Sequence, residues 1–176
     1  MKIEKVVVGY LKENCYILEK NNQVLVVDPG DEAEKIKEKI NNRKVLGILI
    51  THAHPDHIGA LSAFKDIPVY SFSNLEEKEC TIGKFKFNVI FNPGHTSDSV
   101  SYYFKEYNIL FSGDFIFHES VGRCDLPTGN TENMKQSISK IKAYPNNMII
   151  FNTRLSIINK IAFFSKSNLK INTFSI

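Results

Sequence analysis

One short stretch of this chain, THAHPDHIGA (51–60), contains three of its five histidines and one aspartate. The preceding run, RKVLGILI (43–50), is apolar and rich in branched residues, which predicts a buried strand. The following run, HIGALSAFK (57–65), places apolar residues at helical spacing. The segment 51–57, called the histidine box below, is therefore predicted to lie on a strand-to-helix turn.

The spacing of the histidine box suits metal binding. Residues two apart in an extended segment point to the same side, so His52 and His54 can face one metal ion. Asp56 and His57 open the following helix and can turn toward a second ion. Imidazole suits zinc, iron, copper or nickel, a carboxylate adds an oxygen ligand, and two neighbouring ions can clamp a substrate. The alternative, a polar loop with coincidental imidazoles, is disfavoured by this spacing.

The length of 176 residues allows one domain with a sizeable core. No apolar run reaches the ~18 residues of a membrane span, and charged residues interrupt the N-terminal segment, which therefore lacks a signal-peptide pattern. Cys15, Cys80 and Cys124 are expected to be buried free thiols in a reducing compartment. We therefore expect a cytoplasmic protein.

Charge is distributed unevenly along the chain. Residues 1–132 carry 15 basic and all 19 acidic residues, a net charge of −4, whereas residues 133–176 carry seven basic and no acidic residues. A basic tail can bind nucleic acid or a membrane surface. Here the basic residues are scattered among Ile, Phe, Asn and Ser, so we expect neither partner. The sequence does not indicate an oligomeric state.

Hydrophobic patterning predicts a mixture of strands and helices. The predicted strands are 5–10, 14–20, 23–30, 43–50, 67–72, 84–94, 99–107, 108–114 and 146–151. The predicted helices are 31–42, 57–65, 74–79 and 131–144, the last with Thr131 as its N-cap. This mixture favours an α/β fold with two sheets face to face and helices outside them.

Further candidate residues follow other predicted strands. His95 lies in a Pro-Gly turn, and Asp114 ends the strand LFSGD, where a carboxylate can bridge two metal ions. Asp28 ends the strand VVDPG; a turn-forming role and a role in orienting a metal-bound histidine are both open. His118 has no partner at a suitable spacing and is interpreted as a loop residue. Loops at one edge of a sheet sandwich can bring the first three of these residues to the histidine box.

Together these motifs resemble the metallo-β-lactamase superfamily. The matching segments are THAHPDH (51–57), NPGHT (92–96) and SGD (112–114), each after an apolar strand, and DPG (28–30) fits as well. The stretch VGRCDLP (121–127) is similar to the glyoxalase II–like, or hydroxyacylglutathione hydrolase-like, branch. The resemblance covers about residues 1–150 and implies a four-layer αββα sandwich.

The resemblance also implies a ligand set and a reaction. His52, His54 and His95 would bind the first metal, Asp56 and His57 the second, and Asp114 would bridge both. Zinc is the expected metal, one or two ions per chain, with iron or manganese open. The implied reaction is hydrolysis of a small acyl substrate, often a thioester such as a hydroxyacyl-glutathione, by a metal-bound hydroxide that Asp56 orients.

The chain departs from this pattern in several places. Asp98 stands where the branch commonly has glycine, and no helical extension for glutathione follows. The family's late Gly-His turn is missing, because no histidine follows His118. The second metal would then lack a ligand, so the alternative to a hydrolase is a degenerate or weakly active metal-binding protein. A flavodiiron-like oxidoreductase is disfavoured, because that group has an acidic residue where His54 stands.

Two further hypotheses concern the end of the chain and Arg123. Residues from about 151 onward contain no Asp, Glu, Gly or His, which suggests a frame-shifted or replaced ending. The alternative is a divergent C-terminus in which Phe163 and Phe164 pack on the core. Arg123 either pairs with Asp125 or reaches a substrate carboxylate, and we favour the pair.

Overall fold

Two sheets form the centre of the protein in the computed structural model, which describes residues 1–118, 120–154 and the backbone of 158–159. The first sheet has the order β1 (Lys2–Val8), β2 (Glu13–Lys20), β3 (Gln23–Val27), β4 (Lys44–Leu49), β5 (Val69–Tyr70). The second has the order β13 (Ile158–Asn159), β12 (Ile149–Asn152), β9 (Ile109–Gly113), β8 (Val100–Phe104), β7 (Phe85–Phe91), β6 (Glu79–Ile82). A small hairpin joins β10 (Ile116–Phe117) to β11 (Ser120–Val121).

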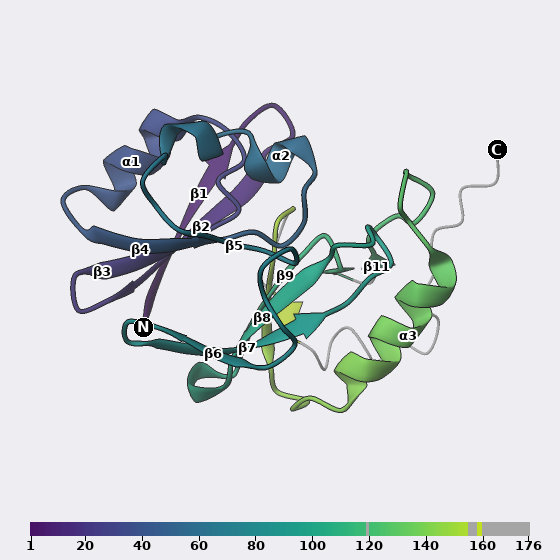
Figure 1. Ribbon diagram of the computed structural model, residues 1–176. Helices are drawn as coiled ribbons and strands as arrows, with labels where there is room; N and C mark the ends of the chain where they lie inside the picture. The colour runs from purple at the N-terminus through teal and green to yellow at the C-terminus, as the bar shows by residue number, and fades with distance from the viewer. Residues whose placement is uncertain (119, 155–157, 160–176) are drawn as a thin grey trace.

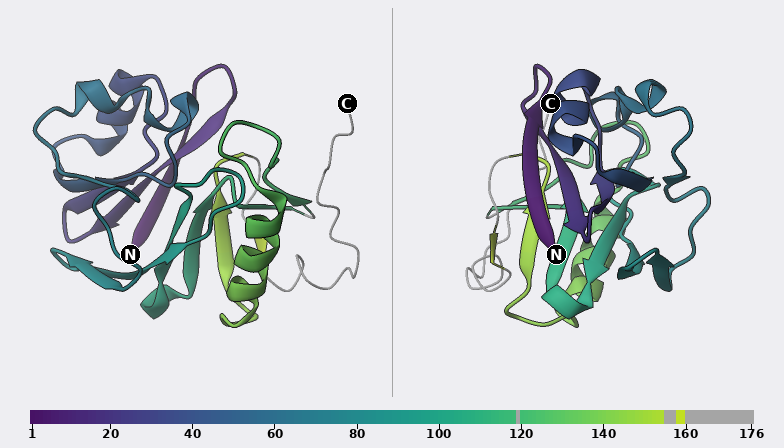
Figure 2. Two further views of the ribbon diagram at one scale, coloured as in Figure 1. Left: turned by 45° about the vertical axis from the view of Figure 1, so that its right-hand side comes forward. Right: turned by 90° about the vertical axis from the view of Figure 1, so that its left-hand side faces the viewer.

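Helices cover the outer face of each sheet (Figure 1). The first sheet carries α1 (Ala33–Ile40) and α2 (Pro55–Ile58), and the second carries α3 (Thr131–Lys142). Short 3₁₀ turns lie at Leu61–Ala63 and Lys105–Tyr107. Turning the molecule shows the same order of helix, sheet, sheet and helix (Figure 2). The predicted αββα sandwich is confirmed.

Alternation along the strands creates this layering. In β2, Tyr16 and Leu18 face the second sheet, whereas Ile17 packs on the α1 side. In β9, Phe111 points into the space between the sheets and Leu110 points toward α3. Because successive side chains of a strand point to opposite faces, a strand covered on both faces must be apolar at every position. This explains the continuous apolar runs that predicted these strands.

The strand ends that carry polar residues meet at one edge of the sandwich. β3 is parallel to β4, and β9 is parallel to β12, so their carboxyl ends lie together within each sheet. Backbone hydrogen bonds then join the two sheets at this edge. The N–H of Val100 donates to the carbonyl of Thr51 at 2.7 Å, and the N–H of Asn14 donates to the carbonyl of Thr153 at 2.8 Å.

Several predicted elements differ in detail. The helix predicted at 74–79 is wrong, because this segment is a turn that leads into β6. The helix predicted at 57–65 is divided into α2 and a 3₁₀ turn. The N-cap of α3 is Asn130 rather than Thr131, since the Asn130 side chain accepts a hydrogen bond from the N–H of Asn133 at 2.9 Å.

The C-terminal segment is described only in part. Residues 151–152 belong to β12, and Phe151 is buried between the sheets. The hypothesis of a replaced ending, and the packing of Phe163 and Phe164, fall on residues outside the described part and remain predictions. Within the described part of the chain, no helix has the length and apolar character to cross a membrane. The three cysteines are free thiols, and only Cys15 is fully buried.

Phe111 offers a test of the inter-sheet core, because its ring contacts the rings of Tyr16, Phe104 and Phe151. We expect Phe111→Ala to lower the free energy of unfolding by about 3–5 kcal/mol, since it leaves a cavity between the sheets. Phe72, which is 42% exposed, provides the control. Phe72→Ala should cost less than about 1 kcal/mol. If urea unfolding showed that the two variants lose the same free energy of unfolding, this account of the core would be contradicted.

Candidate metal centre

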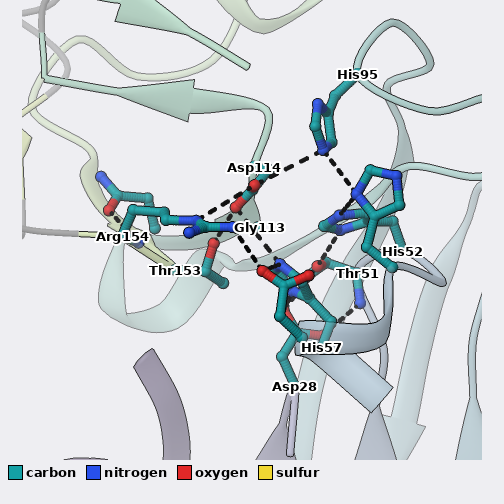
Figure 3. Close-up of polar contacts among 12 residues, drawn as sticks. Asp28, Thr51, His52, His57, His95, Gly113, Asp114, Thr153 and Arg154 are labelled. Atoms are coloured by element: carbon teal, nitrogen blue, oxygen red, sulfur yellow. Dashed lines mark hydrogen bonds and ion pairs between the residues drawn. The ribbon is translucent and has the colours of Figure 1, made fainter. Parts of the chain in front are cut away.

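Three imidazole nitrogens converge at the edge of the sandwich. Nδ1 of His54 lies 3.0 Å from Nε2 of His52 and 3.1 Å from Nε2 of His95. Ligands about 2.0–2.1 Å from a tetrahedral zinc ion are roughly 3.3 Å apart, so this spacing fits a shared metal ion. We call His52, His54 and His95 the three-histidine group. Their ligand atoms lie close together although His95 follows a strand of the second sheet, and Figure 3 shows the His95 ring directed toward the side of the site that carries His52.

Local structure orients each ring. His54 is the extended residue before α2, and Pro55 occupies the first helical position, where a proline is well tolerated. Nδ1 of His95 lies 2.7 Å from the carbonyl of Arg123, which leaves Nε2 of His95 to face the other two rings. Nδ1 of His52 lies 3.2 Å from Oγ1 of Thr51.

A second group lies beside the first and consists of Asp56, His57 and Asp114. Nε2 of His57 lies 3.5 Å from Oδ1 of Asp114 and 3.9 Å from Oδ2 of Asp56. Nε2 of His57 is buried and has no hydrogen-bond partner within the described part of the protein. A buried, unpaired imidazole nitrogen that faces two carboxylates offers a cation two kinds of ligand. We call these residues the second group.

Asp28 contacts His57 of the second group from the interior of the protein. Its carboxylate is fully buried and accepts hydrogen bonds from the N–H and the hydroxyl of Thr51, at 2.7 and 2.6 Å. Nδ1 of His57 lies 3.0 Å from Oδ2 of Asp28. The sequence left Asp28 between a turn-forming and an orienting role. The structure assigns it to orienting His57, as an outer carboxylate does for a metal-binding histidine.

Two glycines allow this close packing. A Cβ atom on Gly30 would lie 1.7 Å from the carbonyl oxygen of Asp56, so the turn after β3 can approach α2 only without a side chain. Gly113 has φ +55°, and a Cβ there would meet Oγ1 of Thr51 at 2.3 Å. Larger residues at either position would displace the chain that carries the second group.

The surroundings keep two of the histidines neutral. Burial, reinforced by the neighbouring His57, holds the pKa of His52 far below its ordinary value. Burial and His95 lower the pKa of His54. Burial opposes charge on His57 as well, but the carboxylates of Asp28 and Asp114 outweigh it and raise the pKa of His57. Neutral imidazole is the form that binds a metal ion, so the lowered pKa values of His52 and His54 favour metal binding.

Glu13 adds a carboxyl group to the same buried region. Its two oxygens are buried without a hydrogen-bond partner among the described residues, and they lie near Asp28 and His57. Burial and the negative charge of Asp28 raise the pKa of Glu13 to about 10. Glu13 is therefore a neutral carboxylic acid near pH 7.

A cleft of about 720 Å³ opens over both groups. His54 and His95 lie on its floor with the carboxylates of Asp56 and Asp114. Apolar side chains form part of its wall: Leu11, Phe117 and Leu126. An open apolar cleft with a few convergent polar groups is the usual form of a small-molecule site.

Comparison with known proteins agrees with this geometry. The family model described as "Metallo-beta-lactamase superfamily" matches residues 8–72 and 69–153. The chain belongs to the metallo-β-lactamase superfamily. It is 34% identical to the probable metallo-hydrolase YqgX of Bacillus subtilis, over 85% of this chain and 88% of the relative. The superfamily is one of metallo-hydrolases, so hydrolysis and metal binding are the properties of the group to which this chain belongs.

Two further relatives give more detail. A hydroxyacylglutathione hydrolase of Legionella pneumophila is 37% identical over 71% of this chain, which spans about half (54%) of that relative's length. The crystal structure of the BLEG-1 B3 metallo-β-lactamase has a TM-score of 0.84 at 31% identity, and the match covers 94% of this chain and 97% of that one. The resemblance to the glyoxalase II–like branch is thus supported.

All six residues that the sequence named as ligands lie in the two groups: His52, His54, Asp56, His57, His95 and Asp114. Their role as ligands remains a prediction. Arg123 forms the expected pair with Asp125, with nitrogen–oxygen distances of 2.7 and 2.6 Å, on the rim of the cleft. His118 is exposed and also lines the cleft.

Sequence reasoning missed two residues that touch the second group. Thr153 donates a hydrogen bond from Oγ1 to Oδ1 of Asp114. Nη2 of Arg154 lies 2.5 Å from Oδ2 of Asp56. Both residues follow β12, and no motif marks them. Only the pairing of β12 with β9, which ends just before Asp114, reveals their position.

Asp98, the departure from the family pattern, contacts the histidine box directly. Its Oδ2 accepts a hydrogen bond from the N–H of Ala53 at 3.1 Å, between two of the box histidines. We expect Asp98→Ala to weaken zinc binding by about tenfold, because the loop loses this support. Asp98→Asn keeps an acceptor oxygen and should bind zinc close to normally. Equal zinc affinity of both variants in competition with a chelator would show that the contact has no such role.

Glu13 predicts a pH dependence of stability in the metal-free protein. Its pKa is raised on folding from its ordinary 4.5 to about 10, so the folded state binds more protons than the unfolded state between these values. Its contribution to stability is full below about pH 4.5 and is lost as the pH rises toward 10. Glu13→Gln should therefore lose less stability than wild type between pH 5 and pH 8. If urea unfolding gave the same change in the free energy of unfolding with pH for wild type and Glu13→Gln, this prediction would be wrong.

Proposed function

We propose that this protein is a metal-dependent hydrolase of small thioesters such as hydroxyacyl-glutathiones. The observation that carries the proposal is the convergence of three imidazole nitrogens below an open cleft, with Nδ1 of His54 3.0 Å from Nε2 of His52 and 3.1 Å from Nε2 of His95. Similarity to a hydroxyacylglutathione hydrolase supports the thioester class. The substrate is a small molecule with an acyl group. Zinc is our proposed metal, because three imidazoles with an open position form a common catalytic zinc site.

A zinc ion on the three-histidine group would lower the pKa of a water molecule and polarise a carbonyl group. The protein's own residues supply the remaining requirements. His52, His54 and His95 would hold this cation, and the lowered pKa values of His52 and His54 favour the neutral form that binds a metal. The carboxylate of Asp56 lies on the cleft floor, where it can accept a proton from the attacking water.

The walls of the cleft suit a substrate with an apolar part. Leu11 and Phe117 can contact the acyl chain or the thiol carrier, and their burial against it would exclude water from the reacting carbonyl. The guanidinium of Arg123 is paired with Asp125, so we do not assign it to a substrate carboxylate. A degenerate protein without turnover remains the alternative that experiment must exclude.

Hydrolysis of S-lactoyl-glutathione by the zinc-loaded protein tests the proposal. Removal of the metal with a chelator should abolish turnover, and zinc should restore it. We expect Asp56→Asn to lower kcat by about 100-fold or more while KM changes little, because the carboxylate acts on the proton and not on substrate binding.

Two controls make the result decisive. Asp66→Asn changes an exposed carboxylate outside the cleft and should leave turnover intact. A β-lactam, the substrate class in the name of the BLEG-1 relative, is the counter-substrate. Absence of thioester turnover by the zinc-loaded protein, or a clear preference for the β-lactam, would overturn the thioester assignment.

A further inference from the structure

The guanidinium of Arg154 lies against the carboxylates of the second group. Nη2 of Arg154 is 2.5 Å from Oδ2 of Asp56, and Nε of Arg154 is 3.7 Å from Oδ2 of Asp114. Figure 3 shows the Arg154 side chain directed at Asp114, with His57 nearby. A permanent positive charge is thus placed between two carboxylates that could otherwise bind a metal ion.

Hydrogen bonds from β2 hold the segment that carries Arg154. The amide nitrogen of the Asn14 side chain donates to the carbonyl of Asn152 at 3.2 Å, and the hydroxyl of Tyr16 donates to the same oxygen at 2.5 Å. The N–H of Asn14 donates to the carbonyl of Thr153. Asn152 and Thr153 are each 1% exposed. Arg154 therefore follows two buried residues whose carbonyl groups are hydrogen-bonded to β2.

The two groups differ in the charge they offer a cation. The three-histidine group offers a cation three imidazole nitrogens. In the second group, the two carboxylates already face a guanidinium at ion-pair distance. A divalent ion bound to Asp56 and His57 would lie within a few ångströms of that guanidinium, where like charges repel strongly in a partly buried site. Metal binding there would require Arg154 to leave.

We propose that Arg154 takes the place of a second metal ion, so that the chain binds one metal ion, on the three-histidine group. The guanidinium neutralises the carboxylates of Asp56 and Asp114 and holds Asp56 in the cleft. This inference rests on the metal centre of the proposed function, but not on its substrate. The two ion pairs place a permanent positive charge beside these neighbouring carboxylates.

Zinc stoichiometry tests the inference without reference to activity. Metal-free protein is dialysed against buffered free zinc, and bound zinc per chain is measured by elemental analysis. We expect wild type to bind one tight zinc ion. Arg154→His removes the guanidinium and supplies a neutral imidazole, so this variant should bind two, the second at least about tenfold more tightly than any second ion in wild type. Arg154→Lys keeps a positive charge and should bind one.

Each result either supports or overturns the inference. Two zinc ions of similar affinity in wild type would overturn it, and this measurement needs no variant. One ion in a folded Arg154→His protein, verified by thermal unfolding, would overturn it as well. If Arg154→His does not fold, Arg154→Gln serves instead, and it must show a tighter second site than Arg154→Lys. Failure of thioester turnover with one zinc bound would contradict the proposed function alone.

Discussion

The buried carboxylate of Asp28 joins the parts of the protein that form the metal centre. It follows β3, and three polar atoms lie against it: the N–H and hydroxyl of Thr51, just after β4, and Nδ1 of His57 in α2. An ionised carboxylate is stable in a protein interior only when donors surround it, so the positions of Thr51 and His57 are strongly constrained. Because Gly30 has no side chain, α2 can pack directly against the turn after β3. The histidine box is thereby fixed to the first sheet.

The remaining ligand candidates reach this point because the second sheet is joined to the first at the same edge. The backbone bond from Val100 to Thr51 links β8 to the residue that binds Asp28. His95 and Asp114 follow β7 and β9 of the second sheet. The site is therefore a product of sheet packing, and its precision depends on the aromatic core between the sheets.

Charge divides the cleft floor into two halves with different capacities. Neutral imidazoles on one side suit a cation that polarises a carbonyl and activates water. Carboxylates on the other side, already paired with Arg154, suit orientation and proton transfer. A single cation from the solvent and one from the chain would together balance the carboxylates. Under this proposal, hydrolysis would require one metal ion instead of the two that a pair of adjacent sites would need.

Much of the architecture was predictable because its signals are local. Continuous apolar runs predict buried strands. The spacing of His52, His54, Asp56 and His57 indicates a metal site whatever the position of the preceding strand in its sheet. The errors also have local causes. The charged stretch 74–79 has too little apolar periodicity to distinguish a helix from a turn before a strand. The helix predicted at 57–65 is interrupted at Gly59, where a Cβ would lie 2.3 Å from the carbonyl of Gly30.

The sequence by itself determined the fold class, the identity of the ligand candidates and their placement at strand ends. Tertiary structure alone decided which charges meet. Nothing in the order of residues relates Arg154 to Asp56, which precedes it by 98 positions. They meet because β12 pairs in parallel with β9 and ends beside Asp114, while Asn14 and Tyr16 hold the following residues. Local patterns cannot encode such a contact, because it depends on the register and packing of strands from both sheets.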